Sequence, residues 1–175
     1  MCGIIGFTGN LQAPGILVDG LQQLEYRGYD SAGIAVNNGS ETKIVKTTGK
    51  VATLREKVEA TADLAGTCGI GHTRWATHGG VTEVNAHPHV SGNVTLIHNG
   101  IIENYKELAA SLKTKGFTAI SETDTEVAAM LIDSLYDGDP FAALKEADKA
   151  LEGAYGFCVM FKDHPGEIYC MRNAS

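Results

Sequence analysis

Short apolar runs alternate with amphipathic stretches along this chain of 175 residues. Apolar runs bounded by glycine or turn residues are typical of buried strands, and they predict strands at 3–7, 33–36, 43–48, 67–72, 94–98, 155–161 and 168–172. Apolar positions three and four residues apart predict helices at 14–26, 51–60, 104–115, 125–136 and 139–151. Short turns between consecutive strands favour antiparallel sheets covered by helices. We therefore expect an α+β fold, not a doubly wound parallel sheet.

Local signals mark several ends of these elements. Thr123 and Glu126 have the spacing of a capping box for the predicted helix at 125–136. Asn104 is placed to cap the predicted helix at 104–115. Asn99-Gly100 is the strongest short hairpin signal and predicts a turn between two strands. The stretch 73–93 has no clear periodicity, and an irregular segment of that length in a small domain is usually functional.

Composition and charge exclude several classes of protein. Hydrophobic residues make up 43% and charged residues 20%, as in an ordinary globular domain, and the length predicts one domain, residues 1–175. The net charge of −7 and the absence of a basic patch argue against nucleic-acid binding. No apolar run reaches the ~18 residues that span a bilayer, and no signal peptide is visible. We expect no membrane association and a cytoplasmic location.

Four cysteines occur without a C-x-x-C pair, which disfavours a zinc or thioredoxin-type motif. Cys68, Cys158 and Cys170 lie in apolar runs, and core packing is expected for them. Cys2 differs because removal of Met1 would leave its thiol and a free α-amine on one residue. An N-terminal amine titrates near pH ~8 and can activate a nucleophile on the same residue. The alternative for Cys2 is a buried cysteine at the start of a core strand.

Polar clusters supply further candidates. Arg74, in the stretch 72–79, follows a strand and can hold a carboxylate with two hydrogen bonds. Asp124 can receive an ammonium group or simply favour a helix N-terminus. The Asn99 amide and the Gly100 backbone N–H can form an oxyanion hole, with a plain turn as the alternative.

A metal hypothesis comes from His87-Pro88-His89. Further histidines at 72 and 98 follow no recognised zinc-ligand spacing, so we predict no metal and no cofactor. His87 and His98 are instead expected to support the site through hydrogen bonds. Arg27, in the polar turn after the first helix, is placed in the same supporting group.

Several strings together resemble one family, the glutaminase domains of the isomerising glutamine–fructose-6-phosphate aminotransferases. The strings are Cys2 to Gly6, Leu24 to Gly33, His72 to Gly79, Asn85 to His89, His98 to Asn104, Ser121 to Val127 and Gly153 to Gly156. Cys2-Gly3-Ile4 marks the wider class of N-terminal-nucleophile amidotransferases, and the strings at 27–33 and 73–79 point to this member of the class. The tyrosine at position 29 argues against amidotransferases that serve other acceptors.

The resemblance implies a four-layer αββα sandwich of antiparallel sheets and hydrolysis of L-glutamine to glutamate and ammonia. It implies that Cys2 is the nucleophile and its own amine the base, while Asn99 and Gly100 form the oxyanion hole. It also implies a glutamine pocket: Arg74 for the α-carboxylate, Thr77 and His78 beside it, Trp75 in the loop above, and Asp124 for the α-ammonium group.

The family's glutaminase domain usually continues beyond the point matching Ser175 and is followed by a sugar-phosphate isomerase domain. We therefore expect a domain that is incomplete at its C-terminus and a missing isomerase partner; a homodimer is also expected. Activity requires removal of Met1. The alternatives left open are a catalytically silent fragment or interaction module, an amidotransferase domain for another acceptor, and, more remotely, a metal-dependent hydrolase.

Overall fold

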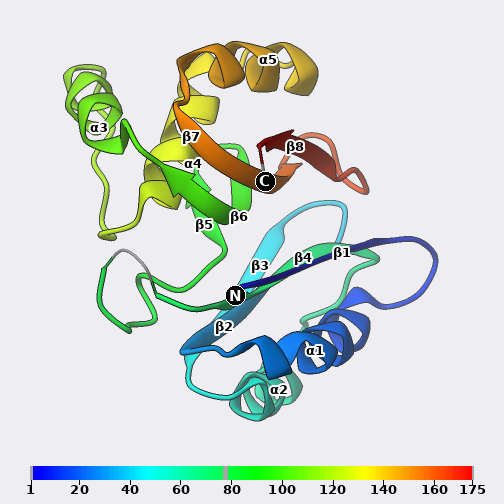
Figure 1. Ribbon diagram of the computed structural model, residues 1–175. Helices are drawn as coiled ribbons and strands as arrows, with labels where there is room; N and C mark the ends of the chain where they lie inside the picture. The colour runs from blue at the N-terminus through cyan, green and yellow to red at the C-terminus, as the bar shows by residue number, and fades with distance from the viewer. Residues whose placement is uncertain (1, 77–78, 175) are drawn as a thin grey trace.

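Two antiparallel sheets form the centre of the molecule (Figure 1). The structure is a computed structural model that describes residues 2–76 and 79–174; for Arg27 it describes the backbone but not the side chain. The first sheet has the strand order β1-β4-β2-β3 and the second the order β5-β6-β7-β8. The strands of the first sheet are β1 (Gly3–Thr8), β2 (Ser31–Asn37), β3 (Thr42–Thr48) and β4 (Cys68–Arg74). Those of the second are β5 (His89–Ser91), β6 (Val94–Ile102), β7 (Gly153–Phe161) and β8 (Tyr169–Asn173).

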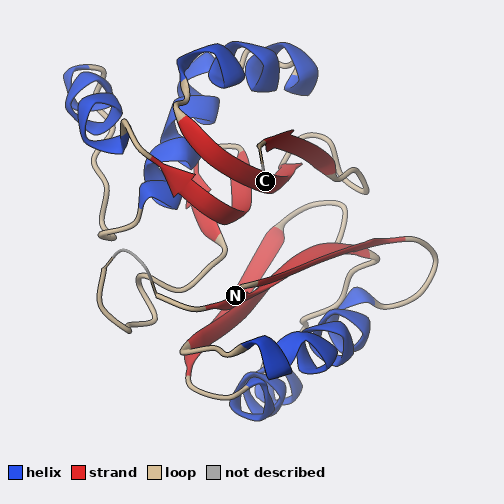
Figure 2. Cartoon of the chain, in the orientation of Figure 1, coloured by secondary structure: helices blue, strands red, loops and turns tan. Residues whose placement is uncertain are grey.

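Helices cover the outer face of each sheet, so that the layers are helix, sheet, sheet and helix (Figure 2). The first sheet is covered by α1 (Ala13–Leu24) and α2 (Val51–Ala60), and a 3-10 turn, η1 (Glu25–Arg27), extends α1. The second sheet is covered by α3 (Tyr105–Thr114), α4 (Asp124–Leu135) and α5 (Pro140–Ala150). The expected αββα arrangement of antiparallel sheets is confirmed.

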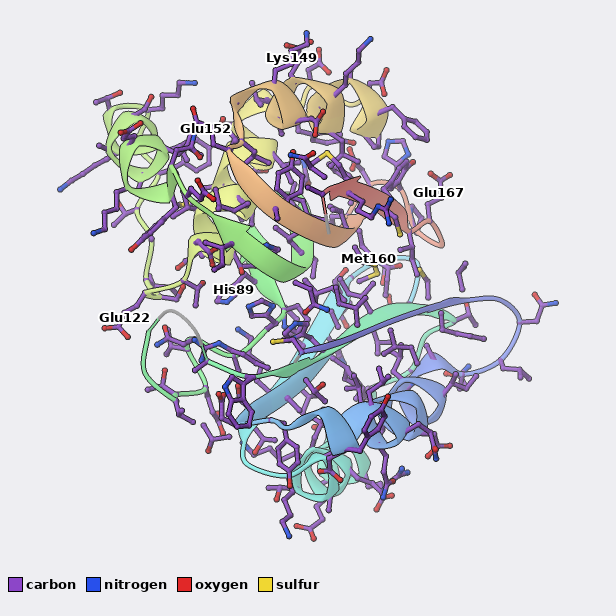
Figure 3. All side chains as sticks on the ribbon, in the orientation of Figure 1. His89, Glu122, Lys149, Glu152, Met160 and Glu167 are labelled. Atoms are coloured by element: carbon purple, nitrogen blue, oxygen red, sulfur yellow. The ribbon has the colours of Figure 1, made fainter. Side chains whose placement is uncertain are left out.

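Apolar side chains form three clusters, one in each gap between layers. The largest lies between the second sheet and its helices, and another lies between the first sheet and α1 and α2. The third lies between the two sheets and is small, with Ala35, Cys68, Ile70, Ile97 and Met160 at its centre. Met160 extends from β7 toward the first sheet in Figure 3. Neighbouring residues of a strand point to opposite faces of the sheet. Each sheet therefore contributes side chains both to the cluster under its helices and to the cluster between the sheets.

Helix starts agree in part with the cap signals. The Thr123 hydroxyl accepts a hydrogen bond from the Glu126 backbone N–H and caps α4, and Asp139 caps α5. Asn104 makes no side-chain cap on α3. Its amide instead donates to the Ala150 carbonyl and accepts from the Glu152 backbone N–H, so it joins α3 to the end of α5. The prediction of a cap at Asn104 was wrong because a tertiary partner took both of its polar atoms.

The predicted hairpin turn at Asn99-Gly100 was also wrong. Both residues lie inside β6, where they face Gly156 and Tyr155 of β7. Gly100 has a φ of 130°, and a Cβ atom there would lie 2.0 Å from the Ala154 carbonyl oxygen. Glycine is thus required for a close approach of two strands and not for a turn.

The cysteines occupy different environments. Cys68 is buried and Cys158 is half-buried, whereas Cys170 is exposed, so core packing was a wrong prediction for Cys170. Cys158 and Cys170 face each other across β7 and β8 with their sulfur atoms 3.5 Å apart. Among the helices that the structure describes, none has the length and apolar character needed to cross a membrane.

Candidate active site

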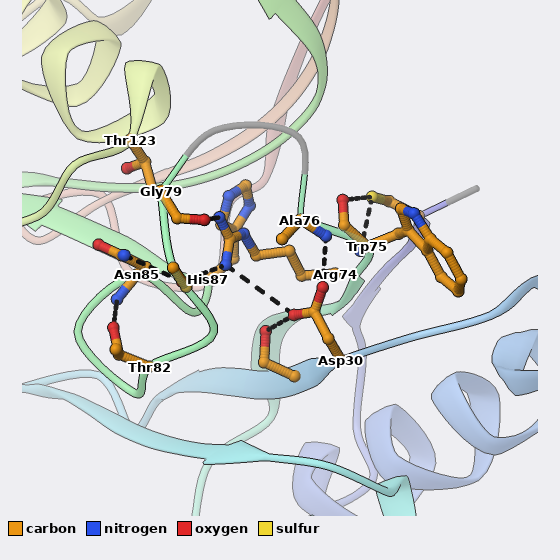
Figure 4. Close-up of polar contacts among 12 residues, drawn as sticks. Asp30, Arg74, Trp75, Ala76, Gly79, Thr82, Asn85, His87 and Thr123 are labelled. Atoms are coloured by element: carbon orange, nitrogen blue, oxygen red, sulfur yellow. Dashed lines mark hydrogen bonds and ion pairs between the residues drawn. The ribbon is translucent and has the colours of Figure 1, made fainter.

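Cys2 lies where the two sheets meet, immediately before β1. Its Sγ accepts a hydrogen bond from the Trp75 backbone N–H at 3.1 Å, and its thiol lies 3.6 Å from the Trp75 carbonyl oxygen (Figure 4). The antiparallel pairing of β1 with β4 brings the two residues together across 73 positions of sequence. The hydrogen bond from the Trp75 N–H holds the sulfur atom in place at the end of β4.

Asn99 of β6 reaches Cys2 from the second sheet. Its Nδ2 donates to the Cys2 carbonyl oxygen at 3.3 Å, and its Oδ1 lies 2.9 Å from Nε2 of His72 on β4. An amide donor therefore contacts the backbone of the candidate nucleophile, and its role in an oxyanion hole stays a prediction. Gly100 follows Asn99 on the same strand and is fixed there by its close approach to β7.

Arg74 is the last residue of β4, and its side chain is buried, with 4% exposure for the whole residue. Its guanidinium donates to the carbonyl oxygens of Gly80 at 3.2 Å and Gly79 at 3.5 Å, and lies 3.9 Å from the Asp30 carboxylate. These contacts tie the irregular loop after β4 to the sheet (Figure 4). Arg74 thus holds this loop in addition to being the candidate ligand of a carboxylate.

Asp30 is a residue of this site that sequence reasoning missed. Its carboxylate accepts hydrogen bonds from the Ala76 backbone N–H and from the Ser31 hydroxyl, and it is the acidic neighbour of Arg74. The Asp30 backbone N–H donates to the Arg74 carbonyl, and the Asp30 carbonyl accepts from the Gly49 N–H, so its backbone is held on both sides. Its position in the same polar turn as Arg27, a predicted supporting residue, was the available signal.

The Trp75 side chain is 55% exposed and lies over the backbone of Gly28. A Cβ atom at Gly28 would be 2.6 Å from the Trp75 ring, and the φ of Gly28 is 89°. Both observations require glycine at this position. The exposed indole thus lies against the turn at Gly28, and its place above a glutamine pocket stays a prediction.

A second tether holds the far side of the loop. The Asn85 amide donates to the Glu122 carboxylate and to the Gly80 carbonyl, and its oxygen accepts from the Glu122 backbone N–H. The Gly80 backbone N–H also donates to Glu122, and these hydrogen bonds lower the pKa of the Glu122 carboxyl. Neither Asn85 nor Glu122 was a predicted site residue, because both gain their role only through this tertiary contact.

Asp124 is the first residue of α4 and is buried, with 6% exposure. Its Oδ2 accepts a hydrogen bond from the Ile102 backbone N–H at 2.9 Å and lies 4.0 Å from Nδ1 of His98. It therefore joins the end of β6, the strand that carries Asn99, to the start of a helix. A carboxylate at this buried helix N-terminus is stabilised by the helix dipole.

Buried histidines and threonines form the support behind these residues. His87 Nδ1 accepts from the His98 backbone N–H, and the Thr125 hydroxyl lies 3.2 Å from His87 Nε2 and 3.0 Å from His98 Nδ1. His89 Nε2 contacts the Thr123 hydroxyl at 3.1 Å. The hypothesis that histidines near the site serve through hydrogen bonds agrees with these contacts.

Burial favours the neutral form of three of the site's imidazoles, those of His72, His87 and His89. It lowers the pKa of His72 to about 4 and that of His89 to about 3, and it holds the pKa of His87 well below its usual value. Within residues 2–76 and 79–174, no group of three or more His, Cys, Asp or Glu side chains is arranged to hold a metal ion.

The structure brings Cys2, Arg74, Trp75 and Asn99 together at one end of the interface between the sheets, and Asp124 lies behind the same end of β6. Other predicted site residues fall outside what it describes. These are Thr77, His78 and the side chain of Arg27; Met1, whose removal is predicted to be required for activity, also lies outside the described residues.

Comparison with known proteins identifies the family. The model of the glutamine amidotransferase domain matches residues 72–175. The chain is 53% identical over 177 residues to the glutamine–fructose-6-phosphate aminotransferase (isomerizing) of Thermus thermophilus, and 49% identical over 174 residues to that of Caldanaerobacter subterraneus. The alignments cover 100% and 98% of this chain but only 29% and 28% of those proteins, so the chain spans less than a third of their length.

Solved structures agree with this result. The glutamine phosphoribosylpyrophosphate amidotransferase from B. subtilis superposes with a TM-score of 0.78 and 29% identity, covering 93% of this chain and 35% of that one. A class-II glutamine aminotransferase domain protein from Silicibacter pomeroyi has a TM-score of 0.56 at 18% identity, over 83% of this chain and 70% of its own, and shares the fold. The matched domain, the relatives and the αββα architecture lead to one conclusion: this chain belongs to the glutamine amidotransferase domain family.

Proposed function

We propose that this chain, residues 1–175, is a glutamine amidotransferase domain that hydrolyses L-glutamine through a thioester on Cys2. The observation that carries the proposal is the meeting of three groups from three segments. The Cys2 sulfur accepts from the Trp75 N–H, and the Asn99 amide nitrogen donates to the Cys2 carbonyl. Acyl transfer uses a nucleophile to attack the carbonyl carbon and a hydrogen-bond donor to stabilise the oxyanion, and both groups lie close together here.

The substrate is a free amino acid, which needs an anchor for each of its two charges. The Arg74 guanidinium can bind the α-carboxylate with two parallel hydrogen bonds. Asp124 can accept the α-ammonium group, and Thr77 and His78 follow Arg74 by three and four positions in the sequence. Trp75 covers the pocket, with Arg27, His87 and His98 as supports.

The reaction then proceeds in two steps. With Met1 removed, the α-amine of Cys2 takes the thiol proton as the sulfur attacks the side-chain carbonyl carbon of glutamine. Asn99 and the Gly100 N–H stabilise the negative oxygen of the tetrahedral intermediate. The protonated α-amine of Cys2 then gives its proton to the amide nitrogen of glutamine. The C–N bond breaks, ammonia departs, and a thioester on Cys2 remains. Water, deprotonated by the same amine, adds to the thioester and releases glutamate with the thiol restored.

The similarity to isomerising glutamine–fructose-6-phosphate aminotransferases supports an aminosugar as the destination of the ammonia. In this proposal a sugar-phosphate isomerase domain outside these 175 residues binds fructose 6-phosphate and accepts the ammonia to make glucosamine 6-phosphate. We propose a cytoplasmic location and a homodimer for the complete protein.

The test is ammonia release from L-glutamine by the full 175-residue chain, with loss of Met1 verified by intact mass. We expect turnover by the Met-free protein and trapping of a γ-glutamyl thioester by hydroxylamine. Cys2→Ala should abolish both signals. Cys170→Ala is the matched control, since this exposed thiol lies on β8 and should leave turnover within about 2-fold.

Folded, Met-free protein that releases no ammonia would overturn the proposal in favour of a silent module. Turnover that survives Cys2→Ala would overturn the role of Cys2. A rate that is unchanged when Met1 is retained would contradict the α-amine as the base.

A further inference from the structure

We propose that His72 is a positioning residue that sets which end of the Asn99 amide faces Cys2. The inference deepens the proposed function and rests on it, because it concerns the oxyanion donor of that reaction. His72 touches neither the sulfur nor the substrate carbonyl in this scheme. It acts through one contact, the 2.9 Å approach of its Nε2 to Asn99 Oδ1.

The two ends of the Asn99 amide have opposite chemistry. Nδ2 carries two hydrogens, so it can donate to the Cys2 carbonyl oxygen, 3.3 Å away, and to an oxyanion formed beside the Cys2 sulfur. A rotation of 180° would exchange nitrogen for oxygen and would place two acceptors against each other. The reversed amide would also repel the negative charge that develops during attack.

The Cys2 carbonyl at one end of the amide and the His72 ring at the other select the same orientation. A backbone carbonyl can only accept, so Nδ2 must face Cys2 and Oδ1 must face His72. The His72 atom at Oδ1 must then be a donor, which requires the proton of the neutral ring on Nε2. Because burial keeps this imidazole neutral, one tautomer specifies one amide orientation.

The His72 ring is itself held firmly. It is fully buried and stacks on the His87 ring, with centroids 4.1 Å apart and planes 21° from parallel. His87 is fixed in turn by the His98 backbone N–H and the Thr125 hydroxyl. Thus β4, the loop before β5, β6 and the start of α4 all contribute to the placement of one donor atom. Preorganised donors of this kind are those that stabilise a transition state without reorganisation.

A double-mutant cycle tests the proposal with the full Met-free chain. Asn99→Ala should lower kcat by about 10²–10³-fold. His72→Phe keeps a flat ring for stacking but has no donor, and we expect a loss of about 10- to 100-fold in kcat with KM changed less than about 3-fold. Because His72 acts through Asn99, adding His72→Phe to Asn99→Ala should change kcat by less than about 2-fold.

Two further measurements separate positioning from general damage. Iodoacetamide alkylates Cys2 by direct displacement, with no oxyanion, so its rate should be the same in His72→Phe and wild type. His72→Gln, which restores a side-chain N–H donor, should recover most of the lost kcat. Long-range proton–nitrogen NMR of the ¹⁵N-labelled wild-type chain should show the His72 ring protonated on Nε2.

Losses that add fully in the double mutant, or alkylation that slows together with turnover, would overturn the proposal. So would a His72 ring protonated on Nδ1, a result that does not depend on any variant folding. If wild type released no ammonia, or Cys2→Ala still released it, the proposed function would fail first, and the tautomer would still decide the amide orientation.

Discussion

Neighbouring positions on one face of β4 and of β6 differ in polarity: one pair is apolar and the next pair is polar. Ile70 and Ile97 are fully buried and pack between the two sheets, whereas two residues further along each strand His72 and Asn99 form a hydrogen bond. A step of two residues keeps a side chain on the same face of a strand. The interface therefore changes from apolar packing to a polar site over a single strand repeat.

The comparison separates two roles along one interface. The isoleucine end contributes buried apolar surface, while the histidine end holds polar atoms at hydrogen-bond distance. The alternate face of β6 contributes as well, because His98 points toward α4 and packs edge-on against Phe157 at 4.9 Å. Four predictions would break or sharpen this division, from the largest effect to the smallest.

Gly100→Ala should cause the largest loss of stability, because it adds a clash to an unfavourable backbone. The new Cβ would lie 2.0 Å from the Ala154 carbonyl at a φ of 130°. Overpacking and strain together should lower the free energy of unfolding by about 2–6 kcal/mol in urea titrations. Gly138→Ala is the control, with a φ of 110° but open space, and should cost about 1–2 kcal/mol. Equal losses would contradict the close-approach argument.

Ile97→Ala and Asn99→Ala should separate stability from catalysis. Truncating the fully buried Ile97 should cost about 2–5 kcal/mol of unfolding free energy while leaving kcat of the folded protein nearly unchanged. Asn99→Ala should cost only about 1 kcal/mol of stability but about 10²–10³-fold in kcat. Urea denaturation and ammonia release measure both quantities for each variant. If the two variants lost stability and kcat to similar extents, the apolar and polar ends of the interface would not have separate roles.

Acid should lower the free energy of unfolding of the protein through the buried histidines at the polar end of the interface. Burial lowers the pKa of His72 to about 4 and of His89 to about 3, so the unfolded chain binds protons near pH 6.5 while the folded chain does not. Stability should therefore fall as pH drops from about 6.5 toward 4, by about 1.4 kcal/mol per pH unit for each histidine. Urea midpoints between pH 8 and 5 measure this slope. His89→Gln should flatten it, and His164→Gln, outside the cluster, should not.

Asp30→Asn should have the smallest of the four effects, and the effect should be seen mainly in KM for glutamine. It removes the charge beside Arg74 and weakens the anchor of the loop that carries Trp75 and Ala76. We expect KM for glutamine to rise about 10-fold with a smaller change in kcat, because a charged contact is worth roughly 1.5–3 kcal/mol. Asp19→Asn, which breaks an exposed pair with Arg55, should change neither constant by more than about 2-fold.

Much of the architecture could be predicted from local pattern. The strands and helices followed apolar periodicity, and caps such as Thr123 and Asp139 marked helix starts. Two local signals failed where a distant partner outweighed them. Asn99-Gly100 had the composition of a turn, but β7 paired with it and extended the strand, and Asn104 bonded to the end of α5 instead of capping α3.

The sequence alone determined the alternation that builds two sheets and their helices, and it marked Cys2, Arg74, Asn99 and Asp124 as chemically capable residues, because residue type and periodicity are local properties. Only the tertiary structure decided that His72 meets Asn99, that Asp30 stands beside Arg74, and that Glu122 and Asn85 hold the loop. Those contacts join segments tens of residues apart, and their geometry depends on how the two sheets pack, which no local pattern encodes.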